Sequence, residues 1–385
     1  MHQRRKELLS LANKIERSAA IHIDKALSTH ISHINTSNKQ STSTSAETWI
    51  NASFYVLSGC CQPLILVLCK SAGIADPKCQ LYMFFYALGP TLVIIPLVRE
   101  GTKVWPSKNT IVKAAGICLW DIICTVTNYI GASLAGPTLF AIIYSSVTIW
   151  TAVLSQIFFQ RKLQPGQWLA VVTVFGGLAL TATDSIQLGE DVLLGLVLIV
   201  IGSAAHAMTY IMSEGIMTVS KETLTVQQNN AIQSGVAATT LLLWQLVYTL
   251  PRWEQKIGRP MHAAGTTYSQ ALGILLLFAL SNLIHSSTFF YTLRYFPGGS
   301  TSAGVMKGLQ AALVFVATHF AYCGRIGGDE MCFSKTKFVS LLTVSGGVMG
   351  YGVATSYYSS FGTENTKAQE SREVPVAASL AIHIT

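Results

Sequence analysis

Two charged residues stand apart because each lies well inside a stretch of apolar sequence. The chain contains 26 Lys and Arg and 18 Asp and Glu, and only Asp121 and Lys307 fall deep within such stretches. Inserting a charge into a membrane is costly, so such residues face protein or water and become functional candidates. Lys307 could bind a phosphate or carboxylate, pair with Asp121 as a gate, or form a structural ion pair. Asp121 is a candidate for proton coupling or gating, or a structural partner without a transport role.

Polar side chains also recur at steps of three or four residues along six of the apolar stretches, which places them on one face of each predicted helix. Six such faces could line a hydrated cavity for a polar solute. The candidate substrate contacts are Lys307, Gln310, Tyr144, Thr148, Asn128, His206 and His285. The alternative is that Ser and Thr bond to backbone carbonyls and that His residues join helices. We find no metal-ligand spacing, and we expect neither a metal nor a cofactor.

The elements that must position these residues are predicted to be membrane helices. Of the 385 residues, 50% are hydrophobic and 11% are charged, whereas a soluble domain carries about 25% charged residues. A membrane helix needs about 20 apolar residues. We predict an all-α, multi-pass integral membrane protein with ten transmembrane helices. The predicted spans are 49–69, 80–98, 111–133, 137–159, 167–183, 192–212, 230–250, 270–291, 300–321 and 338–357.

The two ends of the chain differ from this body. Residues 1–48 combine helically spaced apolar residues with several Lys and Arg, which favours an amphipathic, partly disordered cytosolic arm. A solvated arm without a function of its own is the alternative. Residues 358–385 are predicted to be a disordered tail. Between them we place two five-helix repeats, at 49–183 and 184–357.

A short internal similarity supports this division. Residues 173–177 read TVFGG and residues 343–347 read TVSGG, near the same position of the fifth and tenth spans. After five spans the chain lies on the opposite side of the membrane from where it started. The second repeat therefore begins on that side and is inverted relative to the first. Inverted repeats with a site between them near mid-membrane are typical of transporters.

The charge distribution favours cytosolic N- and C-termini, because Lys and Arg of the first half gather on the side of the N-terminus. The second half does not show this bias. This orientation places two cysteine pairs, Cys69 with Cys79 and Cys323 with Cys332, on the non-cytosolic side. An oxidising compartment would allow a disulfide in each pair.

The stretch 131–184 resembles the drug/metabolite transporter superfamily. The matching pattern is a basic residue, Leu, a short turn and Gln-Trp between the fourth and fifth helices, followed by glycines. Its residues here are Arg161, Lys162, Leu163, Gln167, Trp168, Gly176 and Gly177. The likeness is greatest to the solute carrier 35 (nucleotide-sugar-transporter-like, EamA-like) group, near the chloroquine-resistance-type branch. The resemblance implies a ten-helix carrier and a ninth helix that contacts substrate and bears Lys307.

We therefore expect a secondary active transporter that moves a small polar or anionic organic metabolite by alternating access, not an enzyme. One alternative is a nucleotide-sugar or organophosphate exchanger of the endomembrane system, although Met306 replaces the Asn that precedes Lys in the nucleotide-sugar signature. Another class is an intramembrane enzyme, of serine-protease type at residues 131–133 or acyltransferase type at Asn282 and His285. No Walker-type phosphate loop is present.

The expected partners are a small-molecule substrate and the lipid bilayer, with a second copy of the chain as a further candidate. Nucleic acid is not expected, because the positive charge lies at the ends of apolar spans, where it meets lipid headgroups. An endomembrane location, such as Golgi, vacuole or a lysosome-like compartment, is favoured over the plasma membrane.

Overall fold

The computed structural model describes residues 45–99, 105–135, 143–144, 146–180, 190–325, 332–355 and 357. The chain divides into two compact units, residues 1–48 and residues 49–385. Most of the predicted arm, at 1–44, and the predicted tail, at 358–385, lie outside the described residues. The second unit carries every feature discussed below.

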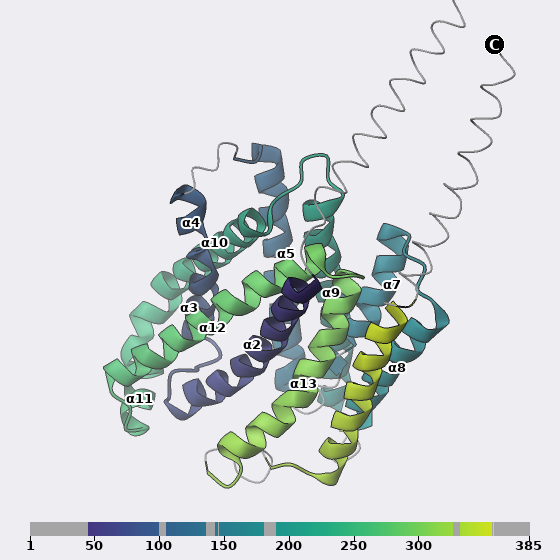
Figure 1. Ribbon diagram of the computed structural model, residues 1–385. Helices are drawn as coiled ribbons and strands as arrows, with labels where there is room; N and C mark the ends of the chain where they lie inside the picture. Colours follow the sequence, from purple (N-terminus) through teal and green to yellow (C-terminus); the bar gives the residue numbers. More distant parts are fainter. Residues whose placement is uncertain are drawn as a thin grey trace, which may run out of the picture. The chain divides into compact units, whose positions relative to one another are not determined.

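All regular elements of the described residues are helices (Figure 1). They are α2 (Ser45–Ser71), α3 (Leu81–Thr91), α4 (Ile94–Arg99), α5 (Lys108–Ala135), α7 (Val147–Phe159), α8 (Pro165–Ala179), α9 (Glu190–Thr218), α10 (Val226–Trp244), α11 (Arg259–Ala263), α12 (Tyr268–Tyr295) and α13 (Ser300–Tyr322). Three short helical segments, η2 (Gln245–Thr249), η3 (Leu250–Arg252) and η4 (Glu254–Gly258), connect α10 to α11. A last helix, Lys335–Thr355, follows α13 and has no label in Figure 1.

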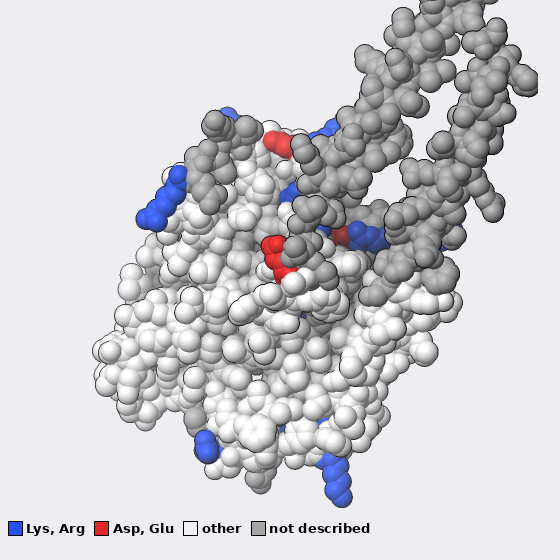
Figure 2. Space-filling model, viewed as in Figure 1, with Lys and Arg blue, Asp and Glu red and all other residues white. Residues whose placement is uncertain are grey.

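Eight helical spans of the described residues are long and apolar enough to cross a membrane; one of them, Leu81–Arg99, joins α3 and α4, and another, Val226–Arg252, joins α10, η2 and η3. Their outward surfaces expose large apolar side chains, for example Leu57, Ile123 and Leu276. On the face shown in Figure 2, Lys and Arg lie toward the two ends, with a broad uncharged band between. This is the surface of a membrane-embedded protein, as the composition predicts.

The predicted fourth and fifth spans are described only in part. Residues 136–142 and 145 lie outside the described residues, and the fourth helix is described as Val147–Phe159. The fifth is described as Pro165–Ala179, and residues 181–189 after it are not described. The other eight predicted spans coincide with the eight long helices, apart from their boundaries.

We name the end of the body where α2 begins the near end, and the end where α2 stops the far end. At the near end, the Trp49 ring lies edge-on to Phe296, with centroids 5.2 Å apart, just before α13 begins. Arg294 at the end of α12 donates a hydrogen bond of 2.5 Å to the Leu224 carbonyl before α10. Several helix termini therefore meet at the near end.

Glu222 caps α5 at this end. Its carboxylate accepts hydrogen bonds from the Ser107 amide, the Ser107 hydroxyl and the Thr110 hydroxyl. These bonds to the ionised form hold the pKa of Glu222 below its usual value. The bonds tie the loop between α9 and α10 to the start of α5.

The end of α2 follows a known helix-stop pattern. The Ile74 and Gly73 amides donate to the Cys69 and Lys70 carbonyls, and Gly73 has a φ of 73°. This is a Schellman motif, in which glycine adopts the left-handed conformation without a Cβ penalty. The chain is turned by this motif into the loop that precedes α3.

That loop explains why one predicted disulfide is wrong. Cys69 and Cys79 are both buried free cysteines. Asp76 Oδ1 accepts hydrogen bonds from the Lys78 and Cys79 amides, and the Cys79 carbonyl accepts from Gln245 and Thr249. Cys79 is thus fixed against η2, so its thiol packs in the core instead of bonding to Cys69.

Two buried clusters distinguish the ends. The near-end cluster contains side chains from α2, α5, α7, α9, α10, α12 and α13, including Tyr55, Tyr210 and Ala303. The far-end cluster draws on α2, α3, η4, α11, α12 and the loop before α3, including Cys69, Cys79 and Phe278. More helices therefore converge on one described core at the near end than at the far end.

A third cluster joins α7, α8, α13 and the last helix, and it contains a reciprocal contact. A Cβ added to Gly177 would lie 2.9 Å from Val344 Cγ2, and one added to Gly347 would lie 2.8 Å from Val174 Cγ2. Residues 177 and 347, and residues 174 and 344, occupy equivalent positions in the TVFGG and TVSGG segments. Each glycine receives the valine of the other segment, as in a contact related by a two-fold axis.

Candidate functional site

Lys307 lies on α13 inside the helix bundle. Every residue from Ser300 to Met306 is buried, while Lys307 itself is partly exposed. Along the same face, Ala303 toward the near end is fully buried, and Ala311 and Val314 toward the far end are partly exposed. Lys307, Ala311 and Val314 therefore share a partly exposed face of α13. No carboxylate pairs with Lys307 among the described residues.

Asp121 lies on the inner face of α5. Its neighbours on that face, at steps of three and seven residues, include Ala114, Cys118, Cys124 and Asn128, which are at most 5% exposed. The Asp121 side chain is 34% exposed. Because the lipid-facing residues of α5, such as Ile123, lie on the opposite side, Asp121 is a partly exposed residue on an otherwise buried face.

The partner of Asp121 is His206 of α9, not Lys307. His206 Nδ1 lies 2.7 Å from Asp121 Oδ1, close enough for an ion pair when the imidazole is protonated. Beside this pair, Trp120 Nε1 donates a hydrogen bond of 3.0 Å to the Ala205 carbonyl. This bond fixes the register of α5 against α9, so it holds Asp121 and His206 opposite each other. The expected Asp121–Lys307 gate is not formed.

Aromatic rings connect this pair to the other side of the bundle. Tyr144 and Tyr210 lie against the His206 ring, with centroid distances of 5.7 Å and 5.3 Å. Tyr210 contacts Phe289 at 4.7 Å, and Phe289 contacts Tyr55 at 5.8 Å. The rings thus form a continuous row from α9 through α12 to α2.

His285 lies at the α2 end of this row. Its ring stacks on Tyr55 at 4.9 Å, and its Nδ1 lies 3.2 Å from Ser58 Oγ. Lys307 is close enough for its charge to interact with His285 and Cys60. That Lys307 and His285 belong to one site remains a prediction.

The same face of α2 and α12 carries a hydrogen-bonded amide pair. Gln62 donates to Asn282 Oδ1 at 3.1 Å, and Asn282 Nδ2 donates to the Tyr86 carbonyl at 2.7 Å. The pair joins α2, α3 and α12. Asn282 therefore joins three helices. This packing role accounts for its hydrogen bonds without the acyltransferase activity that was considered for Asn282 and His285.

Two of the predicted contact residues make hydrogen bonds between helices. Gln310 is 2% exposed and donates a hydrogen bond of 2.9 Å to the Tyr55 carbonyl, which joins α13 to α2. Thr148 is 1% exposed and donates to the Gly304 carbonyl at 2.9 Å, where α7 crosses α13. Both bonds satisfy backbone carbonyls between helices, which is the alternative recognised for polar membrane residues.

Asn128 is buried between α5 and α9. It is 4% exposed, and its amide atoms lie against Gly202, 2.5 Å from the position a Cβ would take. Neither amide atom has a hydrogen-bond partner among the described residues, and Ser203 Oγ nearby in α9 has none either. Buried polar atoms of this kind are usually bonded to ordered water.

Glu214 is a candidate that the sequence analysis missed. The predicted sixth span stops at residue 212, but α9 continues to Thr218 and places Glu214 inside it. Glu214 is 1% exposed, accepts from Arg161 Nη2 at 2.5 Å and accepts from the Ser300 amide at 2.8 Å. Its spacing of four residues from Tyr210 continues the polar stripe of the sixth span, and this was the available signal.

The Glu214 carboxylate joins three elements at the near end. Arg161 precedes α8, and its Nη1 donates to the Gly298 carbonyl at 3.3 Å. Gly299, with a φ of 48°, begins α13, and a Cβ there would lie 2.2 Å from Glu214 Oε1. Only glycine fits this position. The carboxylate therefore holds the start of α13, the helix that carries Lys307, against α9 and the α7–α8 loop.

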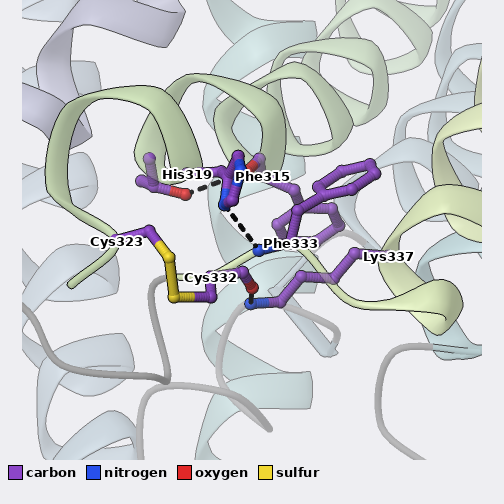
Figure 3. Close-up of a disulfide and its surroundings, with 7 residues drawn as sticks. Phe315, His319, Cys323, Cys332, Phe333 and Lys337 are labelled. Carbon is purple, nitrogen blue, oxygen red and sulfur yellow. Dashed lines mark hydrogen bonds between the residues drawn. A yellow bond between two sulfur atoms is a disulfide. The ribbon is translucent and has the colours of Figure 1, made fainter.

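The far end of α13 is held by the disulfide Cys323–Cys332 (Figure 3). Next to it, the Phe333 amide donates to His319 Nδ1 at 3.1 Å, and Lys337 Nζ donates to the Cys332 carbonyl at 2.7 Å. His319 and the two sulfur atoms lie within 4.8 Å of one another. Because both sulfurs belong to the disulfide, this group fastens α13 to the last helix and offers no thiolate ligands.

Comparison with known proteins adds information on the fold alone. No protein-family model matches the chain, and no curated protein matches it. Twenty-eight chains of solved structures do match. One of them, described only as "Crystal structure of protein", aligns with a TM-score of 0.57 at 11% identity. The alignment covers 81% of this chain and 99% of that chain. The helical arrangement therefore recurs in a protein of unrelated sequence.

Proposed function

We propose that the chain is a secondary transporter that moves a small organic anion across a membrane by alternating access. The observation that carries the proposal is Lys307, a cation on a buried stretch of α13 with no carboxylate partner among the described residues. A charge in this setting requires a compensating ligand. A carboxylate or phosphate of the substrate supplies one.

Alternating access requires two arrangements of the same helices. The reciprocal Gly177–Val344 and Gly347–Val174 contacts support two inverted five-helix repeats, for which exchange of the two arrangements is a natural motion. In the present arrangement, the near-end cluster and the Glu214 contacts close the near end. The exposure of Lys307, Ala311 and Val314 supports substrate entry from the far end.

The family and location belong to the same proposal. The ten-helix layout and the motif around Arg161 to Trp168 support membership of the drug/metabolite transporter superfamily, close to the solute carrier 35 group. The disulfide at the far end supports a far end that faces an oxidising compartment, such as an endomembrane lumen, and cytosolic termini. An organophosphate or nucleotide-sugar exchanger is the variant in which Lys307 binds phosphate.

The enzyme alternative receives less support from the same region. Ser58 Oγ contacts His285, as a serine nucleophile would, but it donates a hydrogen bond of 2.6 Å to the Phe54 carbonyl. A hydroxyl proton directed at a backbone carbonyl is not available for transfer to the imidazole. The contact fits helix packing better than nucleophilic catalysis.

The first experiment identifies the substrate class. A thermal-shift screen of the purified protein against nucleotide sugars, sugar phosphates, amino acids and organic cations should show stabilisation by anions, because a ligand stabilises the state that binds it. Stabilisation by cations alone would contradict the proposal.

The second experiment tests Lys307 with the anion found in the screen. Lys307→Ala should reduce uptake into proteoliposomes to the level of empty vesicles, and Lys307→Arg should retain part of it, because the charge is kept. Lys70→Ala is the matched control, since Lys70 is exposed at the end of α2. Wild-type uptake by a correctly folded Lys307→Ala protein would remove Lys307 from the site.

A further inference from the structure

We propose that Asp121 and His206 form a binding site for one proton, which crosses the membrane together with the substrate. The inference deepens the proposed transport function and rests on it. The geometry that carries it is a carboxylate and an imidazole, from α5 and α9, in contact at 2.7 Å within the bundle. Proton binding converts carboxylate and neutral imidazole into carboxylate and imidazolium, and release reverses this, so no other reactant is needed.

The pair is both held and accessible. The Trp120–Ala205 hydrogen bond lies one residue away on each helix and keeps the two groups opposed. Asp121 Oδ1 is buried and lies 2.7 Å from His206 Nδ1, but it has no hydrogen-bond partner among the described residues; the Asp121 side chain as a whole is 34% exposed and that of His206 is 17% exposed. A proton can therefore reach the exposed part of the pair, and a proton on the imidazole would be held by the charge of this buried oxygen.

The surroundings leave this pair as the charge-changing unit on its side of the bundle. The titratable groups that face it are thiols and phenols, namely Cys118 and Cys124 of α5, Tyr144 before α7 and Tyr210 of α9. Farther along the aromatic row are Tyr55 of α2, His285 of α12 and Lys307 of α13. No titratable side chain of α10 has a described contact with the pair; α10 contributes the Gln233 carbonyl, which accepts from Cys118.

Charge balance gives the coupling its direction. Without substrate, the charges of protonated Lys307 and ionised Asp121 sum to zero over the whole site, although the two groups do not form a pair and Lys307 has no carboxylate beside it among the described residues. A bound monoanion adds one negative charge, which is unfavourable in a low-dielectric interior. A proton on the Asp121–His206 pair restores the balance. Anion binding and proton binding therefore favour each other, which is the thermodynamic requirement for symport.

The first test needs no substrate. Histidine-labelled protein in lipid nanodiscs is titrated from about pH 5 to pH 8, the range in which imidazole changes charge, and His206 is followed by NMR. The His206 signal is assigned by its loss in His206→Gln. We expect the pH dependence of the His206 signal to differ between the wild type and Asp121→Asn, because the substitution removes the carboxylate that lies 2.7 Å from the imidazole. His262, exposed at the end of α11, is the internal control and should not move.

Equal midpoints in the wild type and in folded Asp121→Asn, or no titration of His206 in this range, would overturn the inference. Folding of each variant is checked by gel filtration and thermal unfolding. This result does not depend on transport, so a failure here is distinct from a failure to find a substrate.

The second test uses the anion found in the screen. In proteoliposomes, Asp121→Asn and His206→Gln should both lose stimulation of uptake by an inward proton gradient. Both should keep one-for-one exchange of labelled for unlabelled anion at equal pH, because exchange needs no net proton movement. Gradient stimulation that survives in either variant would contradict the proton site, while the transport proposal would stand.

Discussion

The near and far ends of the body are held by different kinds of interaction. At the near end, seven helices share one core, and the link between α9, the α7–α8 loop and α13 is the Arg161–Glu214–Ser300 contact. At the far end, the covalent bond Cys323–Cys332 lies between α13 and the helix that directly follows it. A hydrogen bond of 2.7 Å from Tyr322 to the Leu64 carbonyl joins α13 to α2 there.

This difference indicates which contacts are free to break. An ion pair, or a hydrogen bond to a helix N-terminus, can break and re-form. A disulfide keeps its two helices joined while other contacts change. The permanent bond joins neighbours in sequence, which would move as a unit. The reversible contact joins elements from both halves of the chain. If the chain moves as the transport proposal requires, opening would begin where Glu214 releases the start of α13.

The largest effect is expected from breaking the near-end contact. Arg161→Ala leaves the carboxylate of Glu214 buried without its cation, and loss of one partner of a buried pair costs about 3–5 kcal/mol. Because the Arg161 side chain is 38% exposed, we expect a cost below that range, about 2–3 kcal/mol. The measurement is the thermal unfolding midpoint in detergent.

Lys162→Ala is the matched control, since Lys162 is an exposed neighbour of Arg161. The double variant Arg161→Ala/Glu214→Gln should recover part of the loss, because the uncompensated charge is gone. An Arg161→Ala protein as stable as Lys162→Ala would show that the contact does not hold the near end.

A comparable or smaller effect is expected from breaking the far-end covalent bond. The sequence separation of Cys323 and Cys332 is 9 residues, for which the chain-entropy estimate is about 2.5 kcal/mol at most. Because this figure is an upper limit, Cys323→Ser/Cys332→Ser should lower the unfolding midpoint by no more than Arg161→Ala does. Cys61→Ser, an exposed free cysteine, is the control. We interpret the disulfide as a bond within a unit that moves as one body. On the proposed transport function, the double variant should then still transport at a permissive temperature. Complete loss of transport would contradict this interpretation.

The sequence predicts the helices better than it predicts the partners of their side chains. Hydropathy locates the eight long helices because each must exceed a length set by the bilayer. The positions of Asp121 and Lys307 on inner helix faces follow from the cost of exposing charge to lipid. Helical spacing predicts that Asp121 lies on an inner face, but the identity of its partner depends on the register between α5 and α9. Trp120 and Ala205 set that register through a contact between residues far apart in sequence.

The misses have local causes. Glu214 escaped notice because hydropathy places the end of a helix within only a few residues, and α9 continues past the predicted end. Cys69 and Cys79 are near each other in sequence, but their loop is folded by the Schellman motif at Gly73 and the Asp76 turn. Gln310 and Thr148 lie on predicted polar faces, yet helices cross at their positions, so their side chains bond to backbone carbonyls.

The smallest predicted effect on stability concerns an ion pair at the far end, between Lys256 and Asp76. Lys256 Nζ lies 3.3 Å from Asp76 Oδ2, with side chains 29% and 18% exposed. Burial opposes ionisation of Asp76, but the Cys79 and Lys78 amides and the Lys256 ammonium outweigh it and hold the Asp76 pKa below its usual value. Lys256→Ala should cost only about 0.5–1 kcal/mol, because the pair is partly solvated.

The pH dependence of this pair has a defined sign. A carboxylate whose pKa is lowered by folding adds stability above its unfolded pKa, about 3.9, and loses it as the pH falls through the folded value. The difference in unfolding midpoint between wild type and Lys256→Ala should therefore be constant from about pH 5 to pH 8 and shrink below about pH 4. A difference that grows on acidification would mean that Lys256 acts through some group other than Asp76. The far end would then depend on a contact that the Asp76 turn does not provide.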